Sequence, residues 1–215
     1  MATYLFGRRI DHWKAEFIIH RLREKWFERA HPEAPWFTKD AVRLLEGLLR
    51  AEDSGLEWGS GRSTLWFARR TLRLVSVEHN LSWYRKIKSE LRRLDLANVD
   101  YRLVETEQGI EDRKAREEYV KLGGTLETVV FDYVLVDGIF REECASLAVN
   151  LVKPGGLLIS DNAQWFLPSE SRAVDAVRDY PTALWREFGA KVQHWRRVWT
   201  GNAVKDTAIF IKPCS

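Results

Sequence analysis

The stretch EWGSGRST, residues 57–64, joins a short apolar strand to the start of a helix. Gly59 and Gly61 let the backbone turn tightly and approach a ligand without a Cβ in the way. Ser63 and Thr64 open the next helix, whose free N–H groups attract the polar or anionic end of a ligand. A strand, a glycine turn and a helix in this order are typical of nucleotide-binding α/β folds.

Glu57 stands two residues before the first glycine and distinguishes between classes of ligand. A carboxylate at this position would repel the pyrophosphate of a dinucleotide, whereas it would hold a ligand that carries an ammonium group. Thr64 also stands where the dinucleotide fingerprint has its third glycine. The methionine moiety of S-adenosylmethionine carries such an ammonium, so the loop favours this cofactor over a nicotinamide dinucleotide.

Strands and helices alternate along the rest of the chain. We expect strands at residues 55–58, 72–78, 101–105, 129–136 and 157–160, and helices at 63–70, 82–96, 141–152 and 169–188, with a helix plus loop over 108–128. Two more strands, near 191–199 and 206–212, are joined by a short turn that suggests a hairpin. The alternation predicts an α/β fold with a mostly parallel sheet. The terminal antiparallel strand distinguishes it from a dehydrogenase sheet of six parallel strands.

Residues 1–50 are expected to form an N-terminal helical extension, and residues 51–215 the domain that binds S-adenosylmethionine. A second helix is expected over 38–50, with Thr38 as its N-cap. The first 30 residues place an apolar set on one helical face: Trp13, Phe17, Ile18, Leu22 and Trp26. So short an extension cannot bury a core of its own, so we expect it to pack over the cofactor face of the sheet.

The composition of the 215-residue chain is that of a globular protein. Its net charge of +3 is too mild to indicate nucleic acid by itself, although basic residues gather in 1–30 and 85–93. No apolar run approaches the ~20 residues of a membrane span, and charges stand where a signal peptide would be apolar. We therefore expect a cytoplasmic protein without a membrane partner. Cys144 and Cys214 match no zinc or redox spacing.

Polar residues also follow the other expected strands. Glu78 ends the second strand, where a carboxylate can accept hydrogen bonds from two ribose hydroxyls, and His79 either caps the next helix or touches the ligand. Asp137 follows the fourth strand, and Asp161 and Asn162 follow the fifth. Their oxygens could orient an acceptor or bind a hard cation such as Mg²⁺. Alternatively, the last two residues simply form a turn.

Together these loops resemble those of class I S-adenosylmethionine-dependent methyltransferases, over roughly residues 33–212. One subgroup has a strand ending in an acid, then Gly-Ser-Gly-x-Ser-Thr, and Val-Glu-His after the next strand. The matching residues are 57–64, Val77-Glu78-His79, Trp83-Tyr84, Val136-Asp137-Gly138 with Arg141, Pro154-Gly155-Gly156, Asp161-Asn162 and, ahead of the domain, Pro35-Trp36. The resemblance implies a Rossmann-like methyltransferase fold, with a mostly parallel seven-stranded sheet, a C-terminal antiparallel hairpin strand and an N-terminal helical extension.

The resemblance also implies roles for individual residues. The expected cofactor-binding residues are Glu57, Gly59, Ser60, Gly61, Ser63, Thr64, Glu78, His79, Trp83 and Asp137. Among them, Glu57 and the two glycines would line the methionine moiety, and Glu78 would bind the ribose. The region of Trp83 and the acids near residues 105–107 would flank the adenine.

A second resemblance is to catechol-type O-methyltransferases, which bind magnesium with an Asp after strand four and an Asp-Asn pair after strand five. Asp137, Asp161 and Asn162 match this pattern in type and position, which makes Mg²⁺ a candidate second cofactor. Arg141 lies where those enzymes have a catalytic Lys, but a guanidinium is a poor general base because it stays protonated. The candidate catalytic residues are Asp137, Arg141 and Asp161.

The function favoured by these features is methyl transfer from S-adenosylmethionine to the hydroxyl of a small molecule or sugar. Three alternatives stay open. The acceptor could be RNA or protein, bound through the basic residues of 1–30 and 85–93, although nucleic acid is the less favoured partner. The chain could be an NAD(P)-dependent oxidoreductase, against which Glu57 and Thr64 argue. It could also be a non-catalytic scaffold, because a fold alone does not imply a function.

Overall fold

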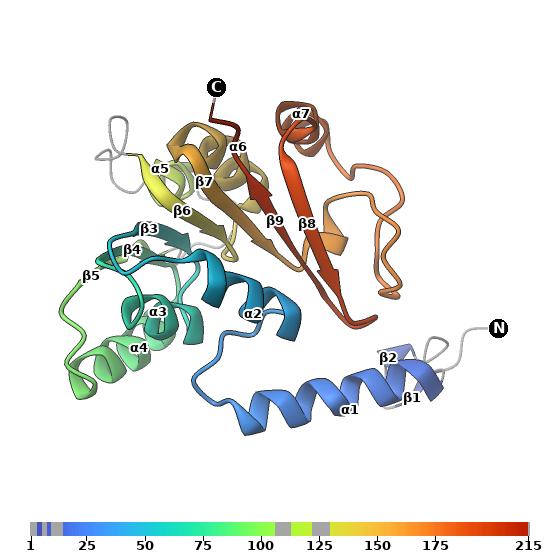
Figure 1. Cartoon of the computed structure of the whole chain (residues 1–215), viewed down its shortest axis with the longest axis horizontal. Coiled ribbons are helices and arrows are strands. Elements are labelled where there is room, and N and C mark those ends of the chain that lie inside the picture. The colour runs from blue at the N-terminus through green and yellow to red at the C-terminus, as the bar shows by residue number, and fades with distance from the viewer. Residues whose placement is uncertain (1–3, 6–7, 10–14, 106–112, 122–129, 215) are drawn as a thin grey trace.

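A seven-stranded sheet runs through the molecule in the order β5-β4-β3-β6-β7-β9-β8 (Figure 1). The computed structural model describes residues 4–5, 8–9, 15–105, 113–121 and 130–214. Five strands pair in parallel, β3 (Ser54–Trp58), β4 (Arg73–Glu78), β5 (Val99–Leu103), β6 (Phe131–Val136) and β7 (Val152–Asp161), and β9 (Asp206–Ile211) is antiparallel to both β7 and β8 (Arg196–Gly201). The mostly parallel sheet with a C-terminal hairpin is therefore confirmed.

Helices cover both faces of this sheet. On one face lie α2 (Lys39–Leu48), α3 (Arg62–Ala68) and, beside α3, α4 (Leu81–Arg93); on the other lie α5 (Arg113–Lys121), α6 (Arg141–Leu151) and α7 (Ala183–Val192). Each layer of helices closes an apolar core. Leu45 and Trp66 belong to the α2–α3 core, and Tyr119 and Trp185 belong to the α5–α7 core.

The central strand β6 shows how the sequence builds these two cores. Its side chains alternate between the faces, as in any strand. Tyr133 and Leu135 enter the α2–α3 core, whereas Val134 and Val136 enter the α5–α7 core, and all four are completely buried. A near-continuous apolar run is what a parallel strand covered on both faces requires.

The segment after β7 differs from the helix predicted over 169–188. After the short helix η1 (Ala163–Trp165), residues 169–182 form turns, and α7 begins only at Ala183. Ser169 and Ser171 explain the difference, because each hydroxyl accepts a hydrogen bond from a backbone N–H two residues ahead. Such local bonds compete with a helix.

Two smaller corrections concern the ends of strands. The first residue of β8 is Arg196 rather than a residue near 191, because α7 continues to Val192. β7 begins at Val152, whereas the sequence predicted a strand from residue 157, so Pro154, Gly155 and Gly156 lie within the strand. At this place the ladder between β6 and β7 shifts register, which makes room for the extra residues.

The N-terminal part is less helical than predicted. It consists of β1 (Tyr4–Leu5), β2 (Arg8–Arg9) and α1 (Ala15–Ala30). Trp13 lies outside the described residues. Ile18, Leu22 and Trp26 are 40%, 62% and 68% exposed, so the predicted apolar face of α1 is not buried within the described part of the chain. None of the described helices is both long and apolar enough to cross a bilayer.

Candidate functional site

The predicted site residues meet at the edge of the sheet where the parallel strands end. The ladders align Trp58 with Val136 and Val136 with Ser160, so Asp137 and Asp161 follow at neighbouring positions. Their side chains lie on the same face as Leu135 and Ile159, which is the α2–α3 face. Glu57, which pairs with Leu135, also belongs to this face. The fold therefore brings together three acids that are far apart in the sequence.

Glu57 is completely buried at the end of β3. Its Oε1 accepts hydrogen bonds from the hydroxyls of Thr64 and, at 2.6 Å, Ser76. Its Oε2 has no hydrogen-bond partner within the described part of the chain. Burial raises the pKa of Glu57 to about 7, although the hydroxyls of Ser76, Thr64 and Ser63 oppose this rise. A buried carboxylate oxygen without a donor is suited to an incoming cation.

The two glycines of the loop differ in their surroundings. Gly59 has a φ of +88°, and a Cβ there would lie 2.7 Å from the backbone of Gly138, so the fold itself requires a glycine. A Cβ on Gly61 would meet only the ring of Trp83, at 4.0 Å. Thr64 fixes the loop between them, because its hydroxyl accepts from the Gly61 N–H at 2.9 Å while it donates to Glu57. The space above Gly61 is thus open to a ligand.

Glu78 ends β4 with its carboxylate directed at the glycine loop. Its Oε2 accepts from the backbone N–H (3.1 Å) and hydroxyl (2.6 Å) of Ser60. Its Oε1 accepts from the backbone N–H groups of His79 and Asn80, at 2.9 and 2.8 Å, and lies 3.1 Å from Nδ1 of His79. Burial alone would raise the pKa of Glu78, but the hydrogen bonds from His79, Ser60 and Asn80 outweigh burial and lower it. The group is therefore an ionised acceptor at neutral pH.

Trp83 and Tyr101 hold the glycine loop from the other side. The indole N–H of Trp83 donates to the carbonyl of Ser60 at 2.7 Å, and the hydroxyl of Tyr101 lies 2.7 Å from that of Ser60. The Tyr101 ring stacks on Tyr84 with 4.5 Å between the ring centroids. Of the acids predicted to flank an adenine, Glu105 is described and exposed, and 106–107 lie outside the described residues.

Arg141 connects the ends of β6 and β7. Its guanidinium donates to the carbonyls of Gly138 (2.9 Å), Asp161 (2.6 Å) and Asp137 (3.0 Å), and to the carboxylate of Asp137 (2.7 Å). Burial raises the pKa of Asp137, and the charge of Arg141 opposes this rise. Since the donors of Arg141 are engaged with the chain, its position suits the support of the two strand ends rather than contact with a substrate.

Asp161 is 3% exposed at the end of β7. Its Oδ1 accepts a hydrogen bond of 2.7 Å from the hydroxyl of Thr207, which lies opposite it on β9. Burial and the charge of Asp137 raise the pKa of Asp161 to about 7. A carboxylate with a pKa near neutrality can take a proton from a substrate and return it to water.

The arrangement of the described residues gives no support to the predicted Mg²⁺ site. Octahedral coordination would need oxygens of Asp137, Asp161 and Asn162 to converge on one point. One carboxylate oxygen of Asp137 accepts from Arg141, and one of Asp161 accepts from Thr207. Asn162 has a φ of 50° at the start of η1 and makes no side-chain capping bond. Within the ranges that the structure describes, no group of three or more His, Cys, Asp or Glu side chains could hold a metal ion.

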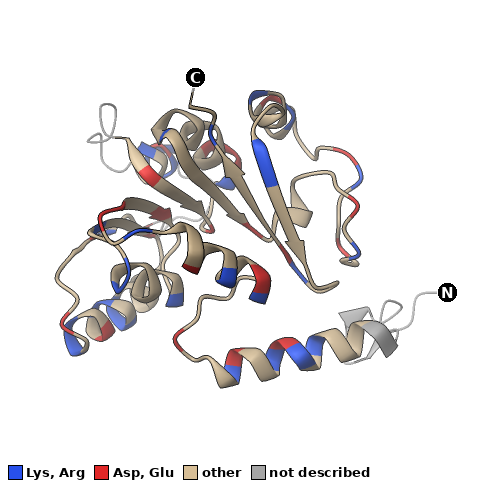
Figure 2. Cartoon of the chain, viewed as in Figure 1, with Lys and Arg blue, Asp and Glu red and all other residues tan. Residues whose placement is uncertain are grey.

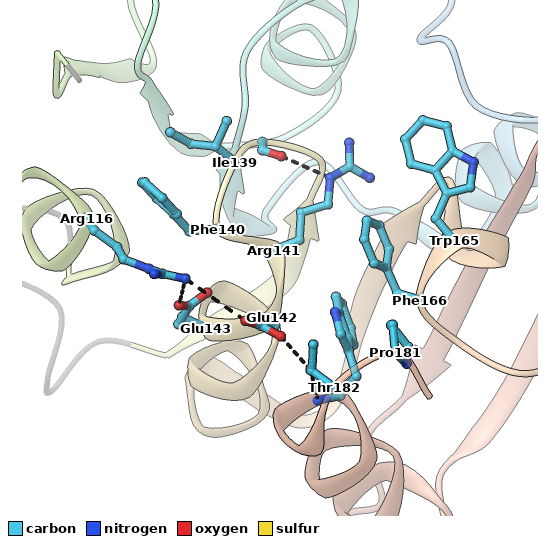
Figure 3. Close-up of a pocket in the computed structure, with 12 residues that line it drawn as sticks. Arg116, Ile139, Phe140, Arg141, Glu142, Glu143, Trp165, Phe166, Pro181 and Thr182 are labelled. Carbon is cyan, nitrogen blue, oxygen red and sulfur yellow. Dashed lines mark hydrogen bonds and ion pairs between the residues drawn. The ribbon is translucent and has the colours of Figure 1, made fainter. Parts of the chain in front are cut away.

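A groove of about 430 Å³ opens beside the same strand ends (Figure 3). Its walls come from the start of α6, the segment after β7, and helices α5 and α7: Arg116, Phe140, Arg141, Trp165, Phe166 and Trp185. The guanidinium of Arg141 lies 5.9 Å from the ring centroid of Trp165 and 5.6 Å from that of Phe166. The groove is therefore next to the carboxylate of Asp137, and its volume is within the range of small-molecule sites.

The N-terminal segment contacts two parts of this edge, the start of α3 and the segment just before β9. Arg62, in the first turn of α3, donates to the carbonyl of Glu28 in α1 at 3.3 Å. Nζ of Lys205, just before β9, lies 2.7 Å from Oε1 of Glu24 and 3.4 Å from Oε1 of Glu28. Trp36, between α1 and α2, lies 6.4 Å from Trp83, measured between ring centroids. These contacts place the second half of α1 across the strand ends.

Comparison with known proteins gives matches among solved structures. No protein-family model matches the chain, and no curated protein does. A methyltransferase-like protein (spo2022) from Silicibacter pomeroyi has a TM-score of 0.54 at 18% identity, covering 84% of this chain and 89% of its own. An rRNA methylase from Streptococcus thermophilus has a TM-score of 0.51 at 10% identity, with coverages of 80% and 93%. SMU.1697c from Streptococcus mutans, solved in complex with SAH (S-adenosylhomocysteine), has a TM-score of 0.52 at 10% identity, with coverages of 79% and 94%.

These similarities and the strand order define the class of fold. The chain has the Rossmann-like fold of class I S-adenosylmethionine-dependent methyltransferases, as the loop pattern predicts. At these identities the match concerns the fold, so the cofactor and the acceptor have to be argued from the site.

Several residues that shape the site were not predicted from the sequence. Ser76 and Thr207 donate to Glu57 and Asp161, and Lys205, just before β9, pairs with Glu24 and Glu28 of α1. Tyr101 was placed only at the start of a strand. No local pattern identifies these residues, because each reaches the site through the register between strands. The only available signal was the alternation of polar positions, such as Ser76, within otherwise apolar strands.

Proposed function

We propose that this chain binds S-adenosylmethionine and transfers its methyl group to a small-molecule hydroxyl. The observation that carries the proposal is the unpaired Oε2 of Glu57, buried beneath a glycine loop whose second glycine leaves open space. The methionine ammonium of the cofactor would supply the missing donor. The complex of SMU.1697c with SAH supports the choice of cofactor.

Glu78 would accept hydrogen bonds from the ribose hydroxyls. Its oxygens already accept from Ser60, His79 and Asn80, so we expect the ribose to replace the Ser60 hydroxyl at Oε2. The hydrogen bonds that keep this carboxylate ionised prepare it as an acceptor. The cofactor would supply the electrophilic methyl group, and the chain's residues would orient the acceptor and receive its proton.

The acceptor would bind beside Asp137 and Asp161. The carboxylate of Asp161 is the better proton acceptor, because that of Asp137 already bonds Arg141. The aromatic groove next to Arg141 offers apolar walls for the body of a small molecule. Alignment of the acceptor with the sulfonium methyl group would provide most of the rate enhancement.

RNA is a second candidate acceptor, because one of the similar structures is an rRNA methylase. The basic residues do not form a uniform surface, since acidic and basic positions are interleaved along α1 (Figure 2). In α4, Lys86 lies over Trp83 and Arg93 pairs with Glu90. We therefore favour a small molecule. Salt-dependent binding of RNA would support the alternative.

A calorimetric titration with S-adenosylhomocysteine tests the proposed cofactor. We expect a Kd in the low micromolar range, on the order of −7 to −8 kcal/mol. Glu78→Ala should weaken binding by roughly 1–3 kcal/mol, while Glu90→Ala, which removes a half-buried acid on α4, serves as the matched control. Tighter binding of NADH than of S-adenosylhomocysteine would contradict the proposal. A methyl-transfer screen over small hydroxyl compounds and RNA then identifies the acceptor.

A further inference from the structure

One face of α1 is apolar and exposed within the described part of the chain. Residues four apart lie above one another on a helix, so Ile18, Leu22 and Trp26 form a row along it. All three are exposed, and so is Ile19 beside the row. Figure 1 shows α1 along one side of the molecule, apart from the sheet. Large apolar side chains that gather on one exposed face are typical of an interaction surface.

Basic residues border this apolar row on both sides. Three of them form the neighbouring row on one side, and one lies on the other side: Arg21, Lys25 and Arg29, and Arg23. All four are exposed. Within the described part of the chain, only Arg21 pairs with an acid, which is Glu24 at 2.8 Å. The exposed face of α1 therefore combines an apolar centre with positively charged borders.

The two acids between residues 18 and 29 lie on the opposite side of the helix. Glu24 and Glu28 stand four residues apart in the row that faces the main fold, where Nζ of Lys205 lies 2.7 and 3.4 Å from their carboxylates. The carbonyl of Glu28 also accepts from Arg62. Acidic and basic positions that alternate along the sequence are thus sorted onto different faces, which leaves only basic charges beside the apolar row.

A partner for this face has to offer apolar contact and negative charge together. A second copy of α1 would bring the same basic borders against these, and like charges repel. A nucleic acid supplies phosphates but no apolar layer for Ile18 and Leu22. A bilayer with anionic lipids supplies acyl chains for the apolar row and head-group charge for the basic borders. Long basic side chains reach the head groups from such a helix, and tryptophan is favoured at this boundary.

We propose that α1 binds the surface of a bilayer that contains anionic lipids, lying along the head groups with Ile18, Leu22 and Trp26 directed toward the acyl chains. The sequence predicted no membrane partner because no segment could span a bilayer, but a helix that lies in the interface needs no span. Lys205 and Arg62 connect α1 to the carboxyl edge of the sheet, so this binding would hold the candidate site beside the bilayer. The inference does not depend on methyl transfer.

Co-sedimentation of the full chain with sucrose-loaded vesicles tests the proposal. The vesicles consist of phosphatidylcholine alone, or of phosphatidylcholine and phosphatidylserine in equal parts. Leu22→Gln is compared with Leu72→Gln, because the two leucines are 62% and 63% exposed and Leu72 lies outside α1. Arg29→Gln is compared with Arg196→Gln, at an exposed arginine of β8. Circular dichroism checks that each variant folds, and Trp26→Gln replaces Leu22→Gln if the latter does not.

We expect binding to the mixed vesicles to be at least roughly tenfold tighter than binding to phosphatidylcholine alone, and to weaken as salt is added. Leu22→Gln should weaken it roughly tenfold and Arg29→Gln about fivefold, whereas Leu72→Gln and Arg196→Gln should leave it unchanged. Bromine atoms on the acyl chains should quench the tryptophan fluorescence of the wild type, and quench that of Trp26→Phe less.

Three results would overturn the proposal: no binding to the mixed vesicles, equal binding to both kinds of vesicle, or binding that Leu22→Gln leaves unchanged. Two further outcomes would assign the face to another partner. A dimer at sedimentation equilibrium that Leu22→Gln dissociates, without vesicle binding, would assign it to a second copy. Binding of single-stranded RNA that Leu22→Gln weakens, again without vesicle binding, would assign it to RNA.

Discussion

Gly59 and Gly61 stand two residues apart in one loop, so alanine substitutions at the two positions can be compared directly. Gly59→Ala places a Cβ 2.7 Å from the Gly138 backbone at a φ of +88°, so we expect a loss of about 1–3 kcal/mol in the free energy of unfolding. Gly61→Ala meets no atom of the described chain closer than 4.0 Å and should change stability by less than about 0.5 kcal/mol. The same Cβ enters the proposed ligand space, so binding of S-adenosylhomocysteine should fall roughly tenfold.

Urea unfolding and calorimetry distinguish the two glycine variants. We expect Gly59→Ala to lose mainly stability and Gly61→Ala to lose mainly affinity. Equal loss of stability in both variants, with unchanged affinity in Gly61→Ala, would show that the loop serves only the fold.

Glu57 makes the stability of the unliganded protein depend on pH. Burial raises its pKa from an ordinary value of 4.5 to about 7, so the folded state holds a proton that the unfolded state has lost between these values. The folded state binds more protons in this window, and stability contributed by the group therefore falls as pH rises from about 4.5 to 7. Glu57→Gln removes the titration. The difference in the free energy of unfolding between Glu57→Gln and the wild type should therefore shift in favour of the variant by about 2–3 kcal/mol from pH 5 to pH 8.

Urea unfolding of both proteins at pH 5 and pH 8 provides the measurement, with Glu90→Gln, at a half-buried position on α4, as the control. A difference between Glu57→Gln and the wild type that stays constant over this range would argue against a buried, protonated Glu57. The variant should also bind S-adenosylhomocysteine more weakly at pH 8, because an amide lacks the charge that the ammonium requires.

The sequence was most informative where the chemistry is local. Glu57, Thr64 and the glycines form one continuous loop, so their roles follow from spacing and from the residue types themselves. Ser76 and Thr207 were not predicted as partners, because a register between strands is set by the whole sheet. Lys205 was not predicted either, because its ion pairs with Glu24 and Glu28 join segments that are far apart in the sequence.

At the scale of elements, the two N-terminal helices differ in what they contribute. α2 buries Ala41, Val42 and Leu45 in the core of the sheet, whereas Ile18, Leu22 and Trp26 of α1 are exposed. α2 is thus part of the main fold, whereas α1 contacts the main fold through polar groups and through Phe27, which packs against the α2–α3 core. The division at residue 50 remains a prediction, and α2 argues for treating the helix as part of the larger unit.

Deletion of residues 1–30 tests this distinction. The shortened chain should stay folded, because the core around α2 is intact, but it should bind S-adenosylhomocysteine more weakly by about 1 kcal/mol, since Arg62 loses its bond to Glu28. Leu45→Ala, at a completely buried position, should instead cost about 2–5 kcal/mol of stability. Unfolding followed by circular dichroism gives the stability, and calorimetry gives the affinity for S-adenosylhomocysteine. Unchanged affinity in the deletion variant would exclude a role for α1 at the site.

Helix and strand patterns predicted most elements because apolar periodicity is a local signal. The helix predicted over 169–188 is absent from residues 169–182, where Ser169 and Ser171 bond the backbone and Pro181 stands just before α7. The serine hydroxyls and the proline favour turns over a helix in this segment.

At the scale of the whole molecule, the order of the strands determines which acids meet at the edge where a ligand can bind. The carboxyl ends of β3 and β4 bring Glu57 and Glu78 to one side, and those of β6 and β7 bring Asp137 and Asp161 to the other. Ligands of open α/β sheets bind at this edge. A cofactor held by the first pair would present its methyl group toward the second pair.

A crystal structure of the chain with S-adenosylhomocysteine is the most direct test of this arrangement. We predict that the methionine ammonium lies within hydrogen-bonding distance of Oε2 of Glu57, and that the ribose hydroxyls contact Glu78. The sulfur should face Asp137 and Asp161. A ligand bound elsewhere, or a dinucleotide occupying the glycine loop in its place, would contradict the account.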